Sequence, residues 1–112
     1  MPLITTKSNV VFTKEDEQKL AELYGKAIGL IGKSDKWLML EFSKPEAMYF
    51  QGREVPCAIA EVSLFGKARS EQYEELTGAL TQAISEVSGI PGDRIYISYS
   101  ELGTWGWAGH NF

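Results

Sequence analysis

The chain of 112 residues contains one cysteine, Cys57, and one histidine, His110. A single cysteine excludes an intrachain disulfide, and with a single histidine it excludes a metal site built mainly from these two residue types. A carboxylate metal site has no support in the sequence either, so we expect neither a metal nor a cofactor. Cys57 also lacks the second thiol of a Cys-x-x-Cys motif, so dithiol redox chemistry is not indicated.

The sequence also lacks long apolar runs and an excess of basic charge. No apolar run approaches the roughly 18 to 20 residues that span a bilayer, and the first residues do not resemble a secretory signal. The formal net charge is −4 and the basic residues are scattered, which disfavours nucleic-acid binding. We therefore expect a cytoplasmic protein without membrane insertion. Secretion by a route that uses no signal peptide stays open.

What is present is the length and apolar content of one small globular domain. Hydrophobic residues make up 44% of the sequence, an ordinary share for a globular protein. We expect residues 1–112 to form a single domain. A domain of this size buries only about two-thirds of its unfolded surface, so partner subunits can contribute to its stability.

Two helices are predicted from apolar stripes that begin at a cap and end at glycine. Thr13 can cap the first helix, which loosens and ends at Gly29 and Gly32. Ser70 can cap the second helix, which stops at Gly89. Apolar residues recur at spacings of three and four in both stripes: Leu20, Leu23, Tyr24, Ala27, Ile28 and Ile31 in the first, and Tyr73, Leu76, Leu80, Ala83 and Val87 in the second.

Strands are predicted on either side of each helix, in the order strand, helix, strand, twice. Their ranges are residues 2–7, 37–42, 56–65 and 94–99, with a short edge piece at 48–50. The segments 35–39 and 93–97 are weakly similar, which hints at a duplicated β-α-β unit.

Two right-handed β-α-β units place both helices on one face of a mixed four-stranded sheet, so the expected class is α+β. The other face has no helix left to cover it. Residues 37–42 are apolar on both of their faces, which predicts that the open side packs against other subunits.

Pro2 is the first candidate for chemistry. If Met1 is removed, Pro2 carries a free secondary amine, and burial lowers the pKa of an amine because it disfavours the charged form. Such an amine can act as a base or nucleophile at neutral pH. The alternative is that proline is only a small residue that methionine aminopeptidase tolerates at this position.

Several short groups of residues, taken in order, resemble the macrophage migration inhibitory factor (MIF) family of the tautomerase superfamily. These groups are Met1-Pro2, Gly32-Lys33, Pro56-Cys57-Ala58, Gly66-Lys67, Asp93-Arg94-Ile95-Tyr96-Ile97, Gly106-Trp107 and Asn111-Phe112. The resemblance covers essentially the whole chain. It implies the tautomerase fold and a homotrimer, in which three sheets surround a channel and three active sites lie between subunits.

The resemblance also implies an isomerase activity that needs no cofactor. In that family the amino-terminal proline is a general base that moves a proton between carbon and oxygen, which makes Pro2 the expected catalytic residue. A small aromatic α-keto acid such as phenylpyruvate is the expected substrate. Two alternatives stay open: a cytokine-like protein that binds a receptor and has a weak or vestigial site, and an enzyme for a different acid.

The same resemblance implies which residues bind the substrate. Lys33 coincides with the family's substrate-binding lysine, although a lysine just past a helix end is also favoured by the helix dipole. The backbone amide of Phe65 is the second expected donor to the carboxylate. Tyr96 and Ser98 are expected to reach the pocket of the adjacent subunit, with Tyr96 along the ring of the substrate. An ordinary inward strand position is the alternative for Tyr96.

Three of these positions depart from the family pattern. Ser98 stands where the family usually has an asparagine, and Phe65 replaces a usual isoleucine. Trp105 occupies a position where the family tends to have a smaller aliphatic side chain. The two aromatic residues enlarge groups that line the pocket, so they bear on the fit of the model substrate and on its rate. Trp105, Trp107 and Trp37 could each be core residues instead.

Overall fold

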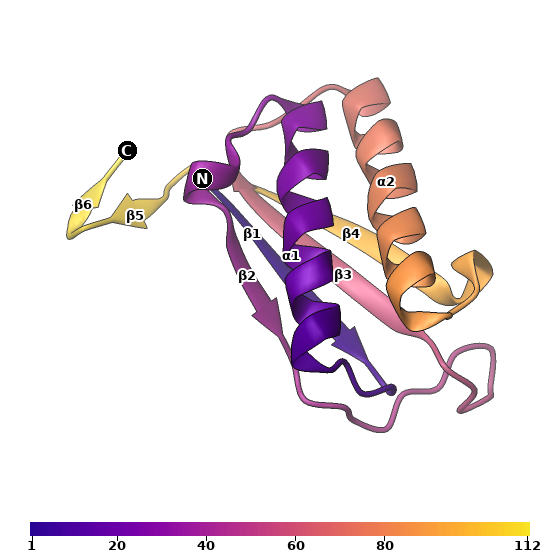
Figure 1. Cartoon of the computed structure of the whole chain (residues 1–112). Helices are drawn as coiled ribbons and strands as arrows, with labels where there is room; N and C mark the ends of the chain where they lie inside the picture. Colours follow the sequence, from indigo (N-terminus) through magenta and orange to yellow (C-terminus); the bar gives the residue numbers. More distant parts are fainter.

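The computed structural model describes residues 1–112 as a four-stranded sheet with two helices on one face (Figure 1). The strands β1 (Pro2–Ser8), β2 (Met39–Phe42), β3 (Ala58–Phe65) and β4 (Ile95–Leu102) lie in the order β2-β1-β3-β4. β1 is parallel to β2, β3 is parallel to β4, and the central pair β1 and β3 is antiparallel. The α+β class, the mixed sheet and the one-sided helices are as the sequence predicted.

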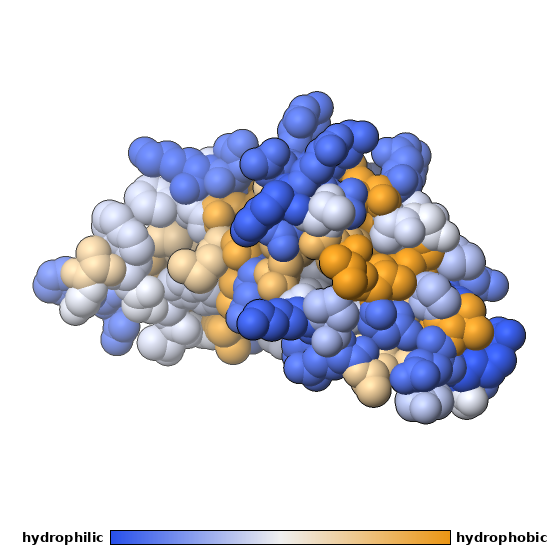
Figure 2. Space-filling view, turned by 60° about the horizontal axis from the view of Figure 1, so that its bottom comes forward, coloured by the Kyte–Doolittle hydropathy of each residue, from blue (hydrophilic) through white to orange (hydrophobic).

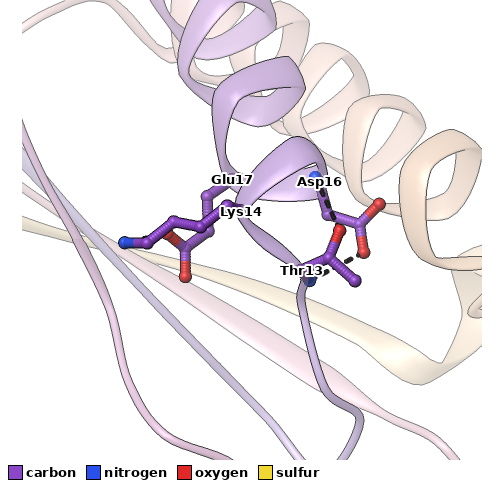
Figure 3. Close-up of polar contacts among 4 residues, drawn as sticks. All are labelled: Thr13, Lys14, Asp16 and Glu17. Carbon is purple, nitrogen blue, oxygen red and sulfur yellow. Dashed lines mark hydrogen bonds and ion pairs between the residues drawn. The ribbon is translucent and has the colours of Figure 1, made fainter.

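Helix α1 (Lys14–Ala27) begins at the predicted cap. The Asp16 N–H donates to Thr13 Oγ1 (3.1 Å), and the Thr13 N–H donates to the Asp16 carboxylate (3.0 Å), which together form a capping box (Figure 3). A 3-10 turn (Ile28–Ile31) prolongs the helix, and Gly32 follows with a φ of 73°. This left-handed conformation turns the chain just before Lys33.

Helix α2 (Ser70–Ser88) lies beside α1, and its predicted cap is wrong by one residue. Ser70 is the first helical residue and Arg69 is the cap, because the Gln72 side chain accepts the Arg69 N–H (2.8 Å) and no serine hydroxyl is needed there. Gly89 ends the helix with a φ of 77°, at the predicted residue. Neither helix is long and apolar enough to cross a membrane.

The strand ends differ from the sequence prediction. β2 begins at Met39, two residues later than predicted, because Trp37 lies in a 3-10 turn (Asp35–Trp37) that the Ser34 hydroxyl caps by accepting the Lys36 N–H (3.1 Å). The expected edge piece at 48–50 is absent from the sheet, and Phe50 only forms an isolated bridge with Arg53. The tail forms an unexpected hairpin, β5 (Gly106–Trp107) and β6 (His110–Asn111), which projects away from the sheet (Figure 1).

The core lies between the helices and the sheet. Both predicted helix stripes contribute to it, together with the inward residues of β1 and β3, and fully buried members include Ile4, Leu20, Tyr24, Ile28, Val62, Leu64, Leu76, Leu80 and Ile84. Each large aliphatic side chain buried in this way stabilises the fold by about 1.5 to 3 kcal/mol. The buried Tyr24 hydroxyl is hydrogen-bonded to Thr6 Oγ1 (2.8 Å), and burial raises the pKa of Tyr24 to about 12.

The open face of the sheet is mixed in character. Met39 and Tyr96 are 67% and 61% exposed. Polar residues lie on the same face, where Lys7 pairs with Glu61 (2.9 Å). The prediction of an apolar open side therefore holds for only part of this face, because charged residues alternate with apolar ones along the strands. Figure 2 shows a different side, the one at the bottom of Figure 1, where apolar and hydrophilic residues also lie interspersed.

Candidate functional site

Pro2 opens the central strand and is buried, with under 2% of its surface exposed. It lies opposite Leu64 of β3, and the next residue, Leu3, lies opposite Met39 of β2. Proline has no N–H for the ladder, which is tolerated at the first position of a strand. Because strands pair on both sides, the position of residue 2 is well defined.

The backbone amide of Phe65 lies next to Pro2. In the chain that carries Met1, the Phe65 N–H donates to the Met1 carbonyl oxygen (3.1 Å). The nitrogen of Pro2 is then part of an amide and has no basic lone pair. The Met1 carbonyl thus occupies the place where another oxygen acceptor could bind once Met1 is gone.

Lys33 lies at the same end of the sheet. Its Nζ donates to the Phe65 carbonyl oxygen (3.0 Å), so the lysine and the Phe65 peptide are held together. Burial, and after it the charge of Lys33, lower the pKa of the Met1 amino group. Because the ring of Pro2 is itself buried, we expect burial to lower the pKa of an amine at residue 2 as well.

A groove of about 520 Å³ opens beside Pro2. Its walls come from residues 1–3, from the segment 36–39 and from the segment 105–107. All three tryptophans of the chain line it, namely Trp37, Trp105 and Trp107. The rings of Trp37 and Trp107 meet edge to face with their centroids 5.0 Å apart. Walls of this kind suit a flat, largely apolar ligand.

The C-terminus contributes a further aromatic side chain near this end of the sheet. The ring of Phe112 lies 5.8 Å from that of Phe65, and the Phe112 N–H donates to the Trp105 carbonyl (3.0 Å). Trp37, Lys36 and Phe112 were not predicted as site residues. Trp37 and Lys36 line the groove, and Phe112 packs against Phe65 beside it. Their residue types were visible in the sequence, but these positions depend on the tertiary fold.

One chain does not bring Tyr96 and Ser98 to this groove. Both are exposed on the open face of β4, and the Tyr96 ring packs against Phe50 with centroids 4.8 Å apart. Their contribution to the pocket of an adjacent subunit stays a prediction.

The single cysteine and the single histidine do not line this groove. Cys57 is buried, and His110 is exposed in β6. No group of three or more His, Cys, Asp or Glu side chains is placed to hold a metal ion. A smaller hollow of about 230 Å³ lies beside Lys7, Ser43 and Lys44 and contains none of the predicted site residues.

Two β-α-β units in one mixed sheet, with a buried proline at the head of the central strand, define a protein of the tautomerase fold class. The family model described as macrophage migration inhibitory factor (MIF) matches residues 1–112, and the chain belongs to this family. The resemblance seen in the sequence is thereby confirmed at the level of family and fold.

Individual relatives are similar over nearly their whole length. The macrophage migration inhibitory factor of Xenopus laevis is 26% identical over 114 residues, which cover 100% of this chain and 99% of that protein. The crystal structure of Leishmania major MIF2 is 30% identical, with a TM-score of 0.95 and coverage of 100% and 97%. A homologue from Prochlorococcus marinus is 30% identical, with a TM-score of 0.89 and 98% coverage of both chains.

Proposed function

We propose that this protein is a cofactor-free keto-enol tautomerase of phenylpyruvate type, in which Pro2 acts as general base and acid after removal of Met1. The observation that carries this proposal is the burial of Pro2 beside the Phe65 amide and Lys33. Membership of the MIF family supports a tautomerase or MIF-like function in general.

The substrate carboxylate binds between Lys33 and the Phe65 amide. A carboxylate oxygen is an acceptor like the Met1 carbonyl, which takes the Phe65 N–H at 3.1 Å. When Met1 is removed, the carboxylate can replace it, and the ammonium group of Lys33 adds a charge-assisted hydrogen bond. The groove wall with Trp105 then receives the aromatic ring.

Pro2 moves one proton between carbon and oxygen. In the direction from keto to enol, the amine takes a proton from the carbon beside the keto group. The electron pair of that C–H bond forms the new C=C bond, the carbonyl π pair moves to oxygen, and the oxygen receives a proton. No electrons are gained or lost. A base with a pKa near neutrality serves this chemistry best. Burial and the charge of Lys33 lower the pKa of the Met1 amino group, and we expect them to act in the same direction on a Pro2 amine.

A second copy of the chain completes the site in a homotrimer. Tyr96 and Ser98 are exposed on the open face, so they are accessible to an adjacent subunit. From there Tyr96 contacts the ring of the substrate and Ser98 faces a polar group at its far end. The short Ser98 hydroxyl leaves room for a bridging water.

A MIF-like cytokine function, with a receptor as partner, is the second candidate. The side chains of Trp107 and Phe112 are 53% and 57% exposed on the C-terminal hairpin and are available for a protein contact. Receptor binding that persists in a Pro2→Gly variant without tautomerase activity would favour this function.

The test of the proposed function is Pro2→Gly in protein whose intact mass shows that Met1 is absent. Glycine keeps a terminal amine but loses the ring that holds it, so kcat/KM for ketonisation of enol-phenylpyruvate should fall by about 10²- to 10⁴-fold. Pro45→Gly is the matched control, because Pro45 is exposed in a loop, and it should keep the wild-type rate. Equal rates for Pro2→Gly and wild type, or full activity in protein that retains Met1, would contradict the mechanism.

A further inference from the structure

Lys36 is the only charged side chain that lines the groove beside Pro2. The other lining residues are Met1, Pro2, Leu3, Trp37, Leu38, Met39, Trp105, Gly106 and Trp107. The groove therefore combines apolar walls with one positive charge and has no carboxylate. An aromatic ligand without a charge on its ring would pack against the apolar walls but would form no ion pair with Lys36.

The ammonium group of Lys36 lies against the aromatic wall. Its Nζ is 5.1 Å from the centroid of the Trp37 ring, which in turn meets the ring of Trp107. A cation over an indole face is attracted to it and can still donate hydrogen bonds to a ligand on its other side. Lys36 is thus held where a ligand between the tryptophans would meet it.

The charge of Lys36 has no acidic partner in the chain. The ion pairs join other cations to carboxylates, namely Lys7, Lys14, Lys26 and Arg69. The carboxylate of the adjacent Asp35 packs against Gly25 of helix α1. Its Oδ2 lies 3.6 Å from the position that a Cβ atom would have on Gly25. The positive charge in the groove therefore stays available for an anion.

Lys33 and Lys36 lie at different positions and would bind different groups of a ligand. The Nζ of Lys33 is bound to the Phe65 carbonyl and does not line the groove, whereas Lys36 lies on the tryptophan wall. A 2-oxo acid with one carboxylate needs only Lys33 and the Phe65 amide. The second cation therefore indicates a second anionic group on the ligand.

We propose that the groove takes aromatic 2-oxo acids that carry a second anionic group on the ring, and that Lys36 binds this group. The inference rests on the proposed tautomerase function for the chemistry, since Pro2, Lys33 and the Phe65 amide still act on the 2-oxo acid end. It assigns Lys36 as a specificity-determining residue. The proposed substrates are therefore aromatic dianions, with one charge on the 2-oxo acid and one on the ring.

The kinetic test compares phenylpyruvate with phenylpyruvate carboxylated at the para position of the ring, in protein without Met1. Lys36→Gln should lower kcat/KM for the carboxylated substrate by about five-fold, mainly through KM, because a partly exposed ion pair is lost. The change for phenylpyruvate should stay below about two-fold. Added salt should reduce the difference in kcat/KM between wild type and Lys36→Gln for the carboxylated substrate, because salt screens the ion pair.

Two further variants serve as controls. Lys36→Arg keeps the charge and should keep most of the preference for the carboxylated substrate. Lys44→Gln removes an exposed lysine that lies beside the separate hollow near Lys7. It should leave kcat/KM unchanged for both substrates. An equal loss on both substrates in Lys36→Gln, or no loss on either, would overturn the proposal.

A binding measurement separates this inference from the proposed function. Because all three tryptophans line the groove, their fluorescence reports its occupation directly. Para-carboxycinnamate should quench wild type at lower concentration than cinnamate, and Lys36→Gln should abolish the difference. If this pattern appears while neither 2-oxo acid is turned over, the proposed function fails and the anion site stands. If both cinnamates bind alike to wild type, the anion site fails, whatever the activity.

Discussion

At residue 2, the chemistry depends on a single peptide bond. With Met1 attached, the Pro2 nitrogen is an amide and the Met1 carbonyl accepts the Phe65 N–H. Without Met1, the nitrogen is an amine in a place where burial and Lys33 lower the pKa of an amino group. Removal of one residue would therefore free both the proposed base, the Pro2 amine, and the proposed carboxylate donor, the Phe65 amide.

Lys33→Gln tests the electrostatic part of this arrangement. The charge of Lys33 favours the neutral form of a nearby amine, so its removal should raise the pKa of the Pro2 amine. The acidic limb of the pH profile of kcat/KM should then move to higher pH, because a base with a raised pKa is neutral only at higher pH. Steady-state kinetics with phenylpyruvate across pH measures this shift.

Lys33→Arg is the control for that measurement. It retains the charge, so the acidic limb should stay near its wild-type position even if the altered geometry lowers the rate. An acidic limb that does not move in Lys33→Gln would show that burial alone sets the pKa of the amine.

At the level of elements, the long connection between β2 and β3 is held by hydrogen bonds from one buried side chain, Arg94, rather than by regular structure. Arg94 is only 5% exposed and donates to the carbonyl oxygens of Phe50, Arg53, Val55 and Pro56, at 2.9 to 3.3 Å. These acceptors satisfy the buried guanidinium without a carboxylate. Its Cζ also lies 5.3 Å from the Phe50 ring, which packs on Tyr96.

Arg94→Met should destabilise the protein by about 2 to 4 kcal/mol, since it removes the four charge-assisted hydrogen bonds by which Arg94 holds the loop. Arg53→Met is the matched control in the same loop. The Arg53 side chain is exposed and makes no hydrogen bond or ion pair, so its replacement should cost below about 0.5 kcal/mol. Chemical denaturation measures both values, and equal stabilities would show that the loop does not depend on Arg94.

At the level of the whole molecule, one chain leaves the proposed site incomplete. Tyr96 lies on the open face of the sheet, away from the groove that contains Pro2. In the proposed homotrimer, Tyr96 would enter the pocket of a neighbouring subunit and complete the site there. Sedimentation at micromolar concentration should then show a species of about 37.5 kDa, three times the 12.5 kDa chain. A monomer would contradict the trimer.

Mixed assembly tests whether the site is shared between chains. Pro2→Gly and Tyr96→Ala should each have low activity alone. When equal amounts are unfolded and refolded together, about a quarter of the sites combine an intact Pro2 with an intact Tyr96 from a neighbour, so activity should recover toward that fraction. Separately refolded proteins, mixed afterwards, are the control. No recovery would place both residues in the same subunit's site.

The amino-acid sequence by itself determined the local features of this protein. The apolar spacing around Leu20 and Leu76 predicted both helix faces, and Gly32 and Gly89 end their segments where expected. These features depend on steric and hydrogen-bonding preferences within a few residues. The apolar start of the chain likewise predicted Pro2 at the head of a strand.

Only the tertiary structure decided what lies beside Pro2. Trp37, Trp105 and Trp107 belong to segments far apart in the sequence. They meet because the 3-10 turn before β2 and the segment 105–107 come together beside the start of β1. The place of Lys36 on that wall, and of the Phe65 amide at the Met1 carbonyl, follows from the same packing. Strand pairing and side-chain packing between distant segments set these distances, and neither is encoded in local periodicity.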